Sequence, residues 1–190
     1  MIETHADGVF VRRRFLPPAV LLQLLAALDR LDPAWAPSRE MRLLGRGQTS
    51  QVRSSELVAQ GPLDEIRRTL APAVLQAARA SGFQFRKPPS LQLFPVRMIG
   101  DAEAPAYQEP HMDSVGPDAA PPLCANVFYA KAQGVVGGEL ALARHRGGDL
   151  SEAIEVSPGA NTLVTFPGDR VHAVRPLTAG QRVSIVINFY

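Results

Sequence analysis

The sequence predicts a mainly β fold that is preceded by two helices. Two segments before residue 88 repeat leucine and other apolar residues at helical spacing. After residue 88, short apolar runs alternate with turn sequences rich in glycine, proline and aspartate. The 190 residues include 17 prolines and 15 glycines, which favours strands and turns over a helical bundle. Together these features indicate an antiparallel barrel or sandwich with helices ahead of it.

The chain is expected to open with a short strand and a leucine-rich helix. Residues 8–15 (GVFVRRRF) have the composition of a strand. Pro17 and Pro18 suit a first helical turn, and the leucines that follow recur at helical spacing. Pro33 ends the run, so the first helix is predicted to lie between these prolines.

A second helix and a loop complete the N-terminal half. Residues 62–82 carry an apolar face at helical spacing, and Gly82 ends the pattern. Pro72 is expected to kink or split this helix, because proline removes a backbone donor. Residues 38–57 are rich in arginine and glycine with little periodicity. They predict a loop or weak hairpin, which is either solvated surface or a lid over a site.

The C-terminal half is predicted to be all β. Its apolar runs are SLQLFPVRMI, ANVFYA, GELALAR, AIEVS, NTLVTFP, VHAVRPL and RVSIVINFY. The turn sequences between them include VVGG, RHRGGD, SPGAN, PGD and TAG. We find no internal repeat, low-complexity tract or clear linker, so the chain is interpreted as one domain over residues 1–190.

Composition narrows the classes of partner and compartment. The formal net charge is +2, and the arginines are scattered among acidic residues, so no basic stripe for nucleic acid is present. A single cysteine, Cys124, excludes a disulfide within the chain and favours a reducing cytoplasm. No run of about 18 apolar residues and no signal sequence occurs, which argues against a membrane partner. The bias toward arginine, alanine and proline is typical of a GC-rich bacterial genome, and the oligomeric state stays unknown.

Three residues have the chemistry of a metal site. His111 and Asp113 stand two apart in QEPHMDS, and on an extended segment such residues point to the same side. The pair alone also fits a polar loop. His172, in TFPGDRVHAVRPL, lies on a later strand that could bring a second imidazole to the same ion. Two histidines and one carboxylate form the facial triad of non-haem Fe(II) oxygenases, which leaves three metal positions open.

Arg182 follows His172 by ten residues and heads the apolar run RVSIVINFY. The TAG sequence is expected to turn the chain, so that Arg182 lies on the next strand beside His172. A buried arginine needs a partner, and its planar guanidinium suits the two oxygens of a carboxylate. Ser184, two residues on, faces the same way and could donate a hydroxyl. These residues predict a binding site for a carboxylate cosubstrate.

The C-terminal half resembles the Fe(II)- and 2-oxoglutarate-dependent dioxygenases, in particular their prolyl-4-hydroxylase-like branch. The similar segments, in order, are HMD (111–113), NVFYA (126–130), GGEL (137–140), PGANTLVTFPGDRVHAV (158–174) and GQRVS (180–184). The resemblance implies a double-stranded β-helix, or jelly roll, over residues 89–190, with residues 1–88 as helical support and a candidate lid. It implies that the metal ligands are His111, Asp113 and His172, with no other catalytic residue.

The resemblance also implies the cofactors and the reaction. The expected cofactors are Fe(II), with 2-oxoglutarate and O₂ as cosubstrates and ascorbate as a candidate reductant. Arg182, Ser184 and Tyr129 are expected to hold 2-oxoglutarate. The expected activity is hydroxylation of an unactivated C–H bond with release of succinate and CO₂; desaturation and cyclisation stay open. At two positions of the 2-oxoglutarate and substrate pocket the sequence departs from the family pattern. Phe94 stands where some relatives have a second tyrosine, and Asn188 stands where some have a tryptophan.

The substrate is mostly unreadable from the sequence. The short chain without a docking module favours a small molecule, such as an amino acid or natural-product intermediate; a protein side chain, as in prolyl hydroxylation, is the alternative. The residues suggested as substrate contacts are Arg46, Gln48, Arg53, Arg97 and Arg144. Other classes stay open: a cupin-like metalloenzyme that does not use 2-oxoglutarate, a jelly roll that binds a ligand without catalysis, and a zinc hydrolase, for which no general base is evident.

Overall fold

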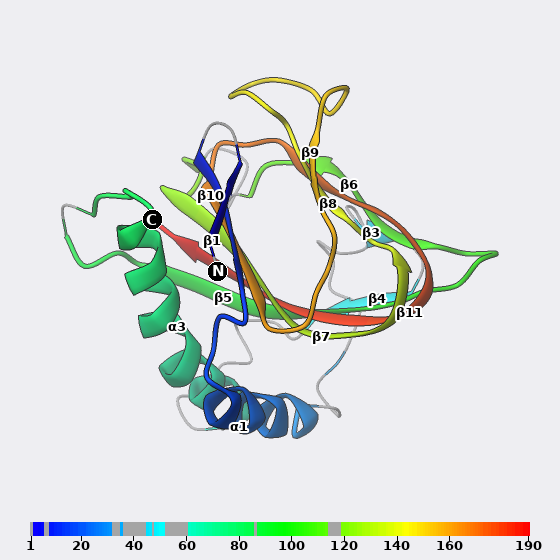
Figure 1. Cartoon of the computed structure of the whole chain (residues 1–190), viewed down its shortest axis with the longest axis horizontal. Helices are drawn as coiled ribbons and strands as arrows, with labels where there is room; N and C mark the ends of the chain where they lie inside the picture. The colour runs from blue at the N-terminus through cyan, green and yellow to red at the C-terminus, as the bar shows by residue number, and fades with distance from the viewer. Residues whose placement is uncertain are drawn as a thin grey trace.

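The fold is a curled antiparallel sheet with helices on its outer side (Figure 1). The computed structural model describes residues 2–5, 8–31, 35, 45–46, 48–51, 61–85, 87–113 and 119–190. The helices are α1 (Pro18–Asp29) and α3 (Pro62–Ala80). The strands are β1 (Ile2–His5), β2 (Val9–Arg13), β3 (Gly45–Arg46), β4 (Gln48–Gln51), β5 (Leu91–Ile99), β6 (Ala106–His111), β7 (Cys124–Gly137), β8 (Leu140–Leu142), β9 (Ile154–Val156), β10 (Thr162–Pro167) and β11 (His172–Phe189). The predicted jelly-roll class is confirmed.

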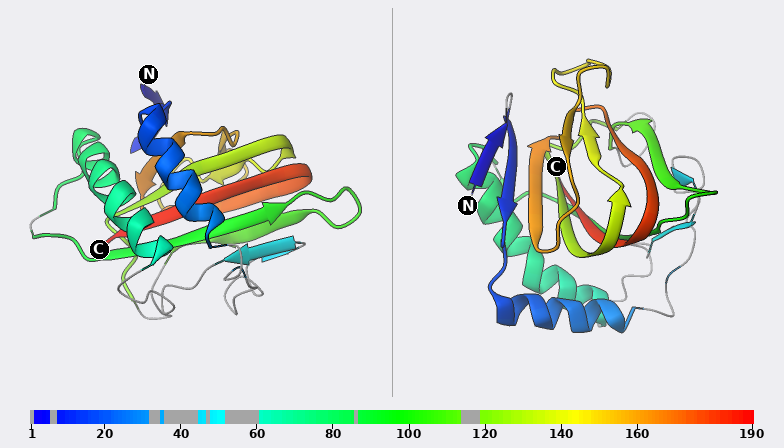
Figure 2. Two further views of the ribbon diagram at one scale, coloured as in Figure 1. Left: turned by 90° about the horizontal axis from the view of Figure 1, so that it is seen from below. Right: turned by 45° about the vertical axis from the view of Figure 1, so that its right-hand side comes forward.

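Strand β11 organises the sheet. The main order is β1-β2-β10-β7-β11-β5-β4, and β11 also pairs with β6 and β8. All of these pairings are antiparallel. Since one strand has four partners, the sheet must curl around it, and Figure 2 shows β7 and β11 bending together around a central space. The curl gives the sheet an inner face, on which the candidate site residues lie.

The turn expected at TAG is not formed, and that prediction was wrong. Residues 172–189 run as one long strand whose pairing with β6 and β7 shifts register in several places. Gly180 has a φ of +78° and lies where a side chain would meet the backbone of Gly134, so the chain bends here without reversing. Bulges of this kind bend a strand while the neighbouring strands stay paired. His172 and Arg182 therefore lie on one bent strand.

The two faces of the sheet bury different side chains. On β11, Val183, Ile185 and Ile187 pack with the leucines of α1 and α3 in the core between sheet and helices. The alternate residues Arg182 and Ser184 face the inside of the curl, and both are buried. Because side chains on both faces of β11 are buried, its sequence is a nearly continuous apolar run, with a few polar residues that point inward.

The helices agree with the sequence except at one proline. Helix α1 begins directly after Pro17, and both helices carry proline in their first turn. Helix α3 continues through Pro72 without a break, so the expected split was wrong. Within the described part of the chain, neither helix is long and apolar enough to cross a membrane.

Strands β6, β3 and β4 lie outside the apolar runs from which strands were predicted. Strand β6 lies in the segment between Ile99 and the metal motif, and β3 and β4 lie in the predicted loop or hairpin of residues 38–57. Strand β3 pairs with β6 and β4 pairs with β5, so each is held by the body of the sheet. Whether residues 38–57 act as a lid stays a prediction, because most of them lie outside the described residues.

Cys124 begins β7 and is completely buried. Burial raises the pKa of its thiol from 9.0 to about 11. Between these values the thiolate forms only in the unfolded chain, so stability should fall as pH rises. We expect the free energy of unfolding to drop by about 1 kcal/mol between pH 8 and pH 10 because of this one group.

Urea unfolding at pH 8, 9 and 10 measures this effect. The Cys124→Ala variant serves as the comparison, because it keeps every other titrating group. Its unfolding free energy should depend less steeply on pH than that of the wild type. In addition, the native thiol should resist a maleimide at pH 8 that labels the unfolded chain quickly. Equal slopes in the two proteins, or rapid labelling of the native state, would contradict the prediction.

Candidate metal centre

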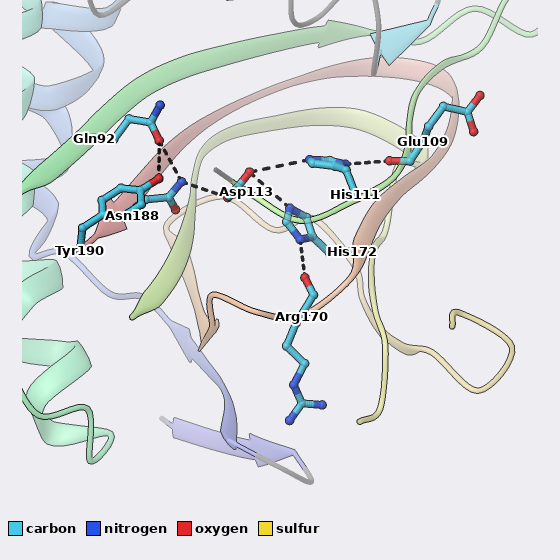
Figure 3. A network of polar contacts seen from close by, with 8 residues as sticks. All are labelled: Gln92, Glu109, His111, Asp113, Arg170, His172, Asn188 and Tyr190. Carbon is cyan, nitrogen blue, oxygen red and sulfur yellow. Dashed lines mark hydrogen bonds and ion pairs between the residues drawn. The ribbon is translucent and has the colours of Figure 1, made fainter. Parts of the chain in front are cut away.

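Two neighbouring strands bring the candidate ligands together. His111 is the last residue of β6 and His172 is the first of β11. The two strands are antiparallel neighbours in which His172 pairs directly with His111. Asp113 follows β6 by two residues, and Figure 3 shows its carboxylate facing both rings. The pairing of β6 with β11 thus brings together two histidines that lie about 60 residues apart in the sequence.

The distances among these side chains suit a single cation. Asp113 Oδ1 lies 3.8 Å from Nε2 of His111 and 3.8 Å from Nε2 of His172. One potential ligand atom from each residue lies within 4.8 Å of the other two. These separations are too long for hydrogen bonds but short enough for one ion with ligand bonds of about 2.0–2.2 Å. The spacing and the donor set therefore fit Fe(II).

Backbone carbonyl groups orient both imidazoles. His111 Nδ1 lies 2.7 Å from the carbonyl oxygen of Glu109, and His172 Nδ1 lies 3.0 Å from that of Arg170. An Nδ1–H that donates to each carbonyl leaves the Nε2 lone pair free, which is the form that binds a metal. Burial lowers the pKa of His111, and the nearby His172 lowers it further. Both effects keep the ring neutral and able to bind a cation.

Packing fixes the second histidine as well. His172 is only 5% exposed. The ring of Phe166 meets it edge-on, with 5.3 Å between centroids, and the ring of His111 lies 4.4 Å away on the same measure. These contacts limit rotation of the imidazole, so His172 is held in place before any ligand arrives.

The predicted cosubstrate residues lie together on the inner face of β7 and β11. Arg182, Ser184 and Tyr129 are all buried, and Ser184 pairs directly with Tyr129. The guanidinium carbon of Arg182 lies 5.3 Å from the centre of the Tyr129 ring. Arg182 Nη1 donates to the carbonyl oxygen of Gly138 at 2.6 Å. The glycines of the GGEL segment thus supply a backbone acceptor that anchors the arginine.

Two polar atoms of this group have no hydrogen-bond partner in the described part of the chain. They are Arg182 Nε and Tyr129 Oη, both inaccessible to solvent. Burial raises the pKa of Tyr129 and lowers the pKa of Arg182. The attraction between the two side chains partly offsets both shifts. Unpaired buried donors are costly, which indicates that a ligand completes them. A carboxylate, as in 2-oxoglutarate, fits both donors.

Of the five residues suggested as substrate contacts, Arg97 and Arg144 have side chains within the described structure. Arg97 lies on the helix-facing side of β5, where its guanidinium covers the Trp35 ring at 4.9 Å and lines a cavity of about 290 Å³. Arg144 is exposed after β8, with its Nε 3.8 Å from Glu152. Arg46 and Gln48 belong to β3 and β4, but their side chains are outside the described structure.

Arg53 lies outside the described residues altogether. His145 is exposed in the segment after β8. Phe94 packs with the apolar cluster inside the curl and offers no hydroxyl group there.

Three polar residues at the site were not singled out from the sequence. The amide nitrogen of Asn188 donates to Asp113 Oδ2 at 3.0 Å, and Gln92 and Tyr190 join this network (Figure 3). In the sequence, Asn188 stands out only because some relatives have a tryptophan near this position. Its position was informative nonetheless, because an asparagine six residues after Arg182 in an apolar strand shares the inner face.

Comparison with known proteins agrees with this geometry. Residues 99–190 match the family model of the 2OG-Fe(II) oxygenase superfamily. No curated protein sequence matches the chain. Among solved structures, a prolyl-4-hydroxylase from Pseudomonas putida is 20% identical with a TM-score of 0.66, covering 96% of this chain and 92% of its own.

Two further structures show the same fold. An oxidoreductase of the 2OG-Fe(II) oxygenase family from Burkholderia pseudomallei is 18% identical with a TM-score of 0.71, covering 96% of this chain and 84% of its own. HygX from Streptomyces hygroscopicus, solved with nickel, 2-oxoglutarate and hygromycin B, is 14% identical with a TM-score of 0.67, covering 97% and 83%.

The match spans the region that carries the site. His111, Asp113 and His172 lie within residues 99–190, and so do Arg182 and Tyr129. The donor set, its spacing and the unpaired groups beside it suit Fe(II) and 2-oxoglutarate, the metal and cosubstrate for which this superfamily is named. Residues 99–190, which carry the whole of this site, belong to the 2OG-Fe(II) oxygenase superfamily.

Proposed function

We propose that this oxygenase hydroxylates a C–H bond of a small molecule, such as an amino acid or natural-product intermediate. In this proposal His111, Asp113 and His172 hold Fe(II), and Arg182 with Tyr129 binds the distal carboxylate of 2-oxoglutarate. The proposal rests on one observation. The inner face of the sheet holds a set of metal-ligand atoms and, beside it, a pair of buried donors that lack partners among the residues that the structure describes. The three ligand atoms lie within 4.8 Å of one another, and the donors are Arg182 Nε and Tyr129 Oη.

Each residue has a distinct part in this mechanism. The two histidines present neutral Nε2 atoms, and Asp113 adds one negative charge, so the site binds a divalent cation while keeping other positions open. When bound, Fe(II) with 2-oxoglutarate and O₂ supplies the oxidising power needed to cleave a C–H bond. Arg182 orients the cosubstrate by its far end, and the surrounding apolar side chains exclude water from the reacting atoms.

Two structures of this fold bear on the size of the substrate. HygX, whose structure includes hygromycin B, shares this fold with a TM-score of 0.67. The prolyl-4-hydroxylase shares it equally, at 0.66. A prolyl-type protein side chain is therefore kept as the competing substrate class.

An anaerobic titration tests the proposed site. Fe(II) and then 2-oxoglutarate are added to metal-free protein, and the visible spectrum is followed. A weak absorption band in the visible region is expected from the chelate of Fe(II) with 2-oxoglutarate. A folded, metal-loaded protein without this band would contradict the proposal and favour a cupin-like enzyme that does not use 2-oxoglutarate.

A second assay distinguishes the substrate classes. Release of succinate from 2-oxoglutarate in air is measured with free amino acids, with other small molecules and with proline-containing peptides. We expect stimulation by a compound of the first two groups. Stimulation by peptides alone would overturn the small-molecule part of the proposal and leave the metal and cosubstrate sites intact.

A further inference from the structure

Asn188 lies at the centre of a polar network on the inner face of β11. Its side chain is completely buried. Its Nδ2 donates to Asp113 Oδ2 at 3.0 Å and to Gln92 Oε1 at 3.3 Å. The hydroxyl group of Tyr190 donates to the same oxygen of Gln92 at 3.1 Å. Figure 3 shows these side chains side by side, with Asp113 between Asn188 and the two histidines.

The network fixes which way the amide of Asn188 points. If the amide were reversed, its carbonyl oxygen would face both the carboxylate of Asp113 and the carbonyl oxygen of Gln92, and all three groups are acceptors. Gln92 is held in turn by the phenol of Tyr190. The arrangement therefore requires Asn188 to donate toward Asp113, and this hydrogen bond is strengthened by the charge of the carboxylate.

This hydrogen bond divides the roles of the two carboxylate oxygens. Oδ2 of Asp113 accepts from Asn188, whereas Oδ1 lies 3.8 Å from each of the two histidine Nε2 atoms. One oxygen is thereby held away from the histidines and the other is aimed between them. A carboxylate held in this way offers a metal a single oxygen in a fixed direction.

We propose that Asn188 is a positioning residue for the metal ligand Asp113, supported by Gln92 and Tyr190. The inference rests on the proposed function of the triad. It assigns to this chain's own asparagine the task of orienting the one ligand that does not lie on a strand: Asp113 follows β6, while both histidines belong to paired strands.

An unpaired oxygen of Asn188 argues against a purely structural role for this residue. Asn188 Oδ1 is buried and has no hydrogen-bond partner among the described residues. An unpaired buried acceptor destabilises the fold, so an apolar residue at this position would stabilise the strand as well or better. What an apolar residue could not provide is the hydrogen bond to Asp113.

The test compares metal binding by two variants of similar chemistry. Asn188→Leu removes the donor and keeps the number and branching of the side-chain non-hydrogen atoms. Asn126→Ala is the matched control, because Asn126 is equally buried on the neighbouring strand but bonds to Thr165 and the Ile187 carbonyl. Binding of Mn(II) to metal-free protein is measured from the loss of the free-ion resonance signal, and the Co(II) absorption spectrum reports the ligand geometry.

We expect Asn188→Leu to weaken Mn(II) binding by about 10- to 100-fold and to alter the Co(II) spectrum. Asn126→Ala should keep the affinity of the wild type even where urea unfolding shows it to be less stable. Gln92→Leu should have a smaller effect in the same direction as Asn188→Leu, because it leaves the donor present but less firmly held.

The outcomes separate this inference from the proposed function. If the wild type binds Mn(II) and Asn188→Leu binds it within twofold with an unchanged Co(II) spectrum, the positioning role is overturned and the triad stands. If the wild type binds no divalent metal, the proposed function itself fails. Should Asn188→Leu not fold, Gln92→Leu decides the question, since an affinity equal to the wild type would overturn the role.

Discussion

Replacing His172 with alanine is expected to abolish turnover of 2-oxoglutarate. His172 supplies one of two neutral nitrogen ligands, and the remaining His111 and Asp113 stand on a single short segment. A metal held by only two protein ligands loses most of its affinity, so Fe(II) binding should weaken by at least about 100-fold. The visible band of the anaerobic titration should disappear as well.

The buried position of His172 makes a control for folding necessary. His145→Ala changes a histidine that is exposed in the segment after β8, and this variant should keep wild-type metal affinity and turnover. In addition, His172→Gly leaves a space beside Phe166 that free imidazole could fill, so added imidazole should partly restore succinate release. Full activity of His172→Ala would show that the metal is held elsewhere.

The sequence was informative about elements because their patterns are local. Leucines at helical spacing predicted α1 and α3, and alternating apolar runs predicted most of the strands after residue 88. Strand β6 was missed because its segment, AYQEPH, has little apolar alternation. It is a strand because it pairs with β11 and β3, partners that a local pattern does not contain.

The candidate triad could be proposed from the sequence because of the chemistry of its residues, although they lie far apart in the chain. Few histidines occur in the chain, and His111, Asp113 and His172 have the chemistry of one kind of site. Their meeting, however, depends on the register that pairs His172 with His111 across two strands. Because a shift of one residue would turn one of them to the other face, only the structure could establish that their ligand atoms converge.

The directions of two side chains illustrate the same limit. Arg97 was suggested as a substrate contact, yet β5 turns it toward the helices and places Val96 and Met98 inside. Asn188 was passed over, although its partner Asp113 lies 75 residues away in the chain. In both cases the missing information was the direction of a side chain, which follows from the register of strands that are distant in sequence.

Arg182→Met is the second change with a large expected effect. Methionine keeps much of the volume and removes the charge and every donor of the guanidinium group. If Arg182 binds the distal carboxylate, KM for 2-oxoglutarate should rise by about 100-fold, which corresponds to about 2.7 kcal/mol of lost binding. Arg182→Lys should fall between this variant and the wild type, because one ammonium cannot replace a planar pair of donors.

The control is a change in the cosubstrate. A 2-oxo acid without the distal carboxylate cannot use Arg182, so any slow turnover that it supports should differ little between the wild type and Arg182→Met. Tyr129→Phe removes only a hydroxyl group and should raise KM for 2-oxoglutarate by about tenfold. The three variants thus form a series in which the loss follows the number of donors removed.

A structural effect of Arg182 must be separated from this binding effect. Its Nη1 bonds to the carbonyl oxygen of Gly138, so Arg182→Met leaves that buried acceptor unpaired and should lower the free energy of unfolding by about 1–3 kcal/mol. Loss of stability alone would reduce the amount of folded enzyme and leave KM unchanged. An unchanged KM for 2-oxoglutarate in folded Arg182→Met would therefore mean that other donors hold the carboxylate, and that the unpaired Arg182 Nε and Tyr129 Oη serve another ligand.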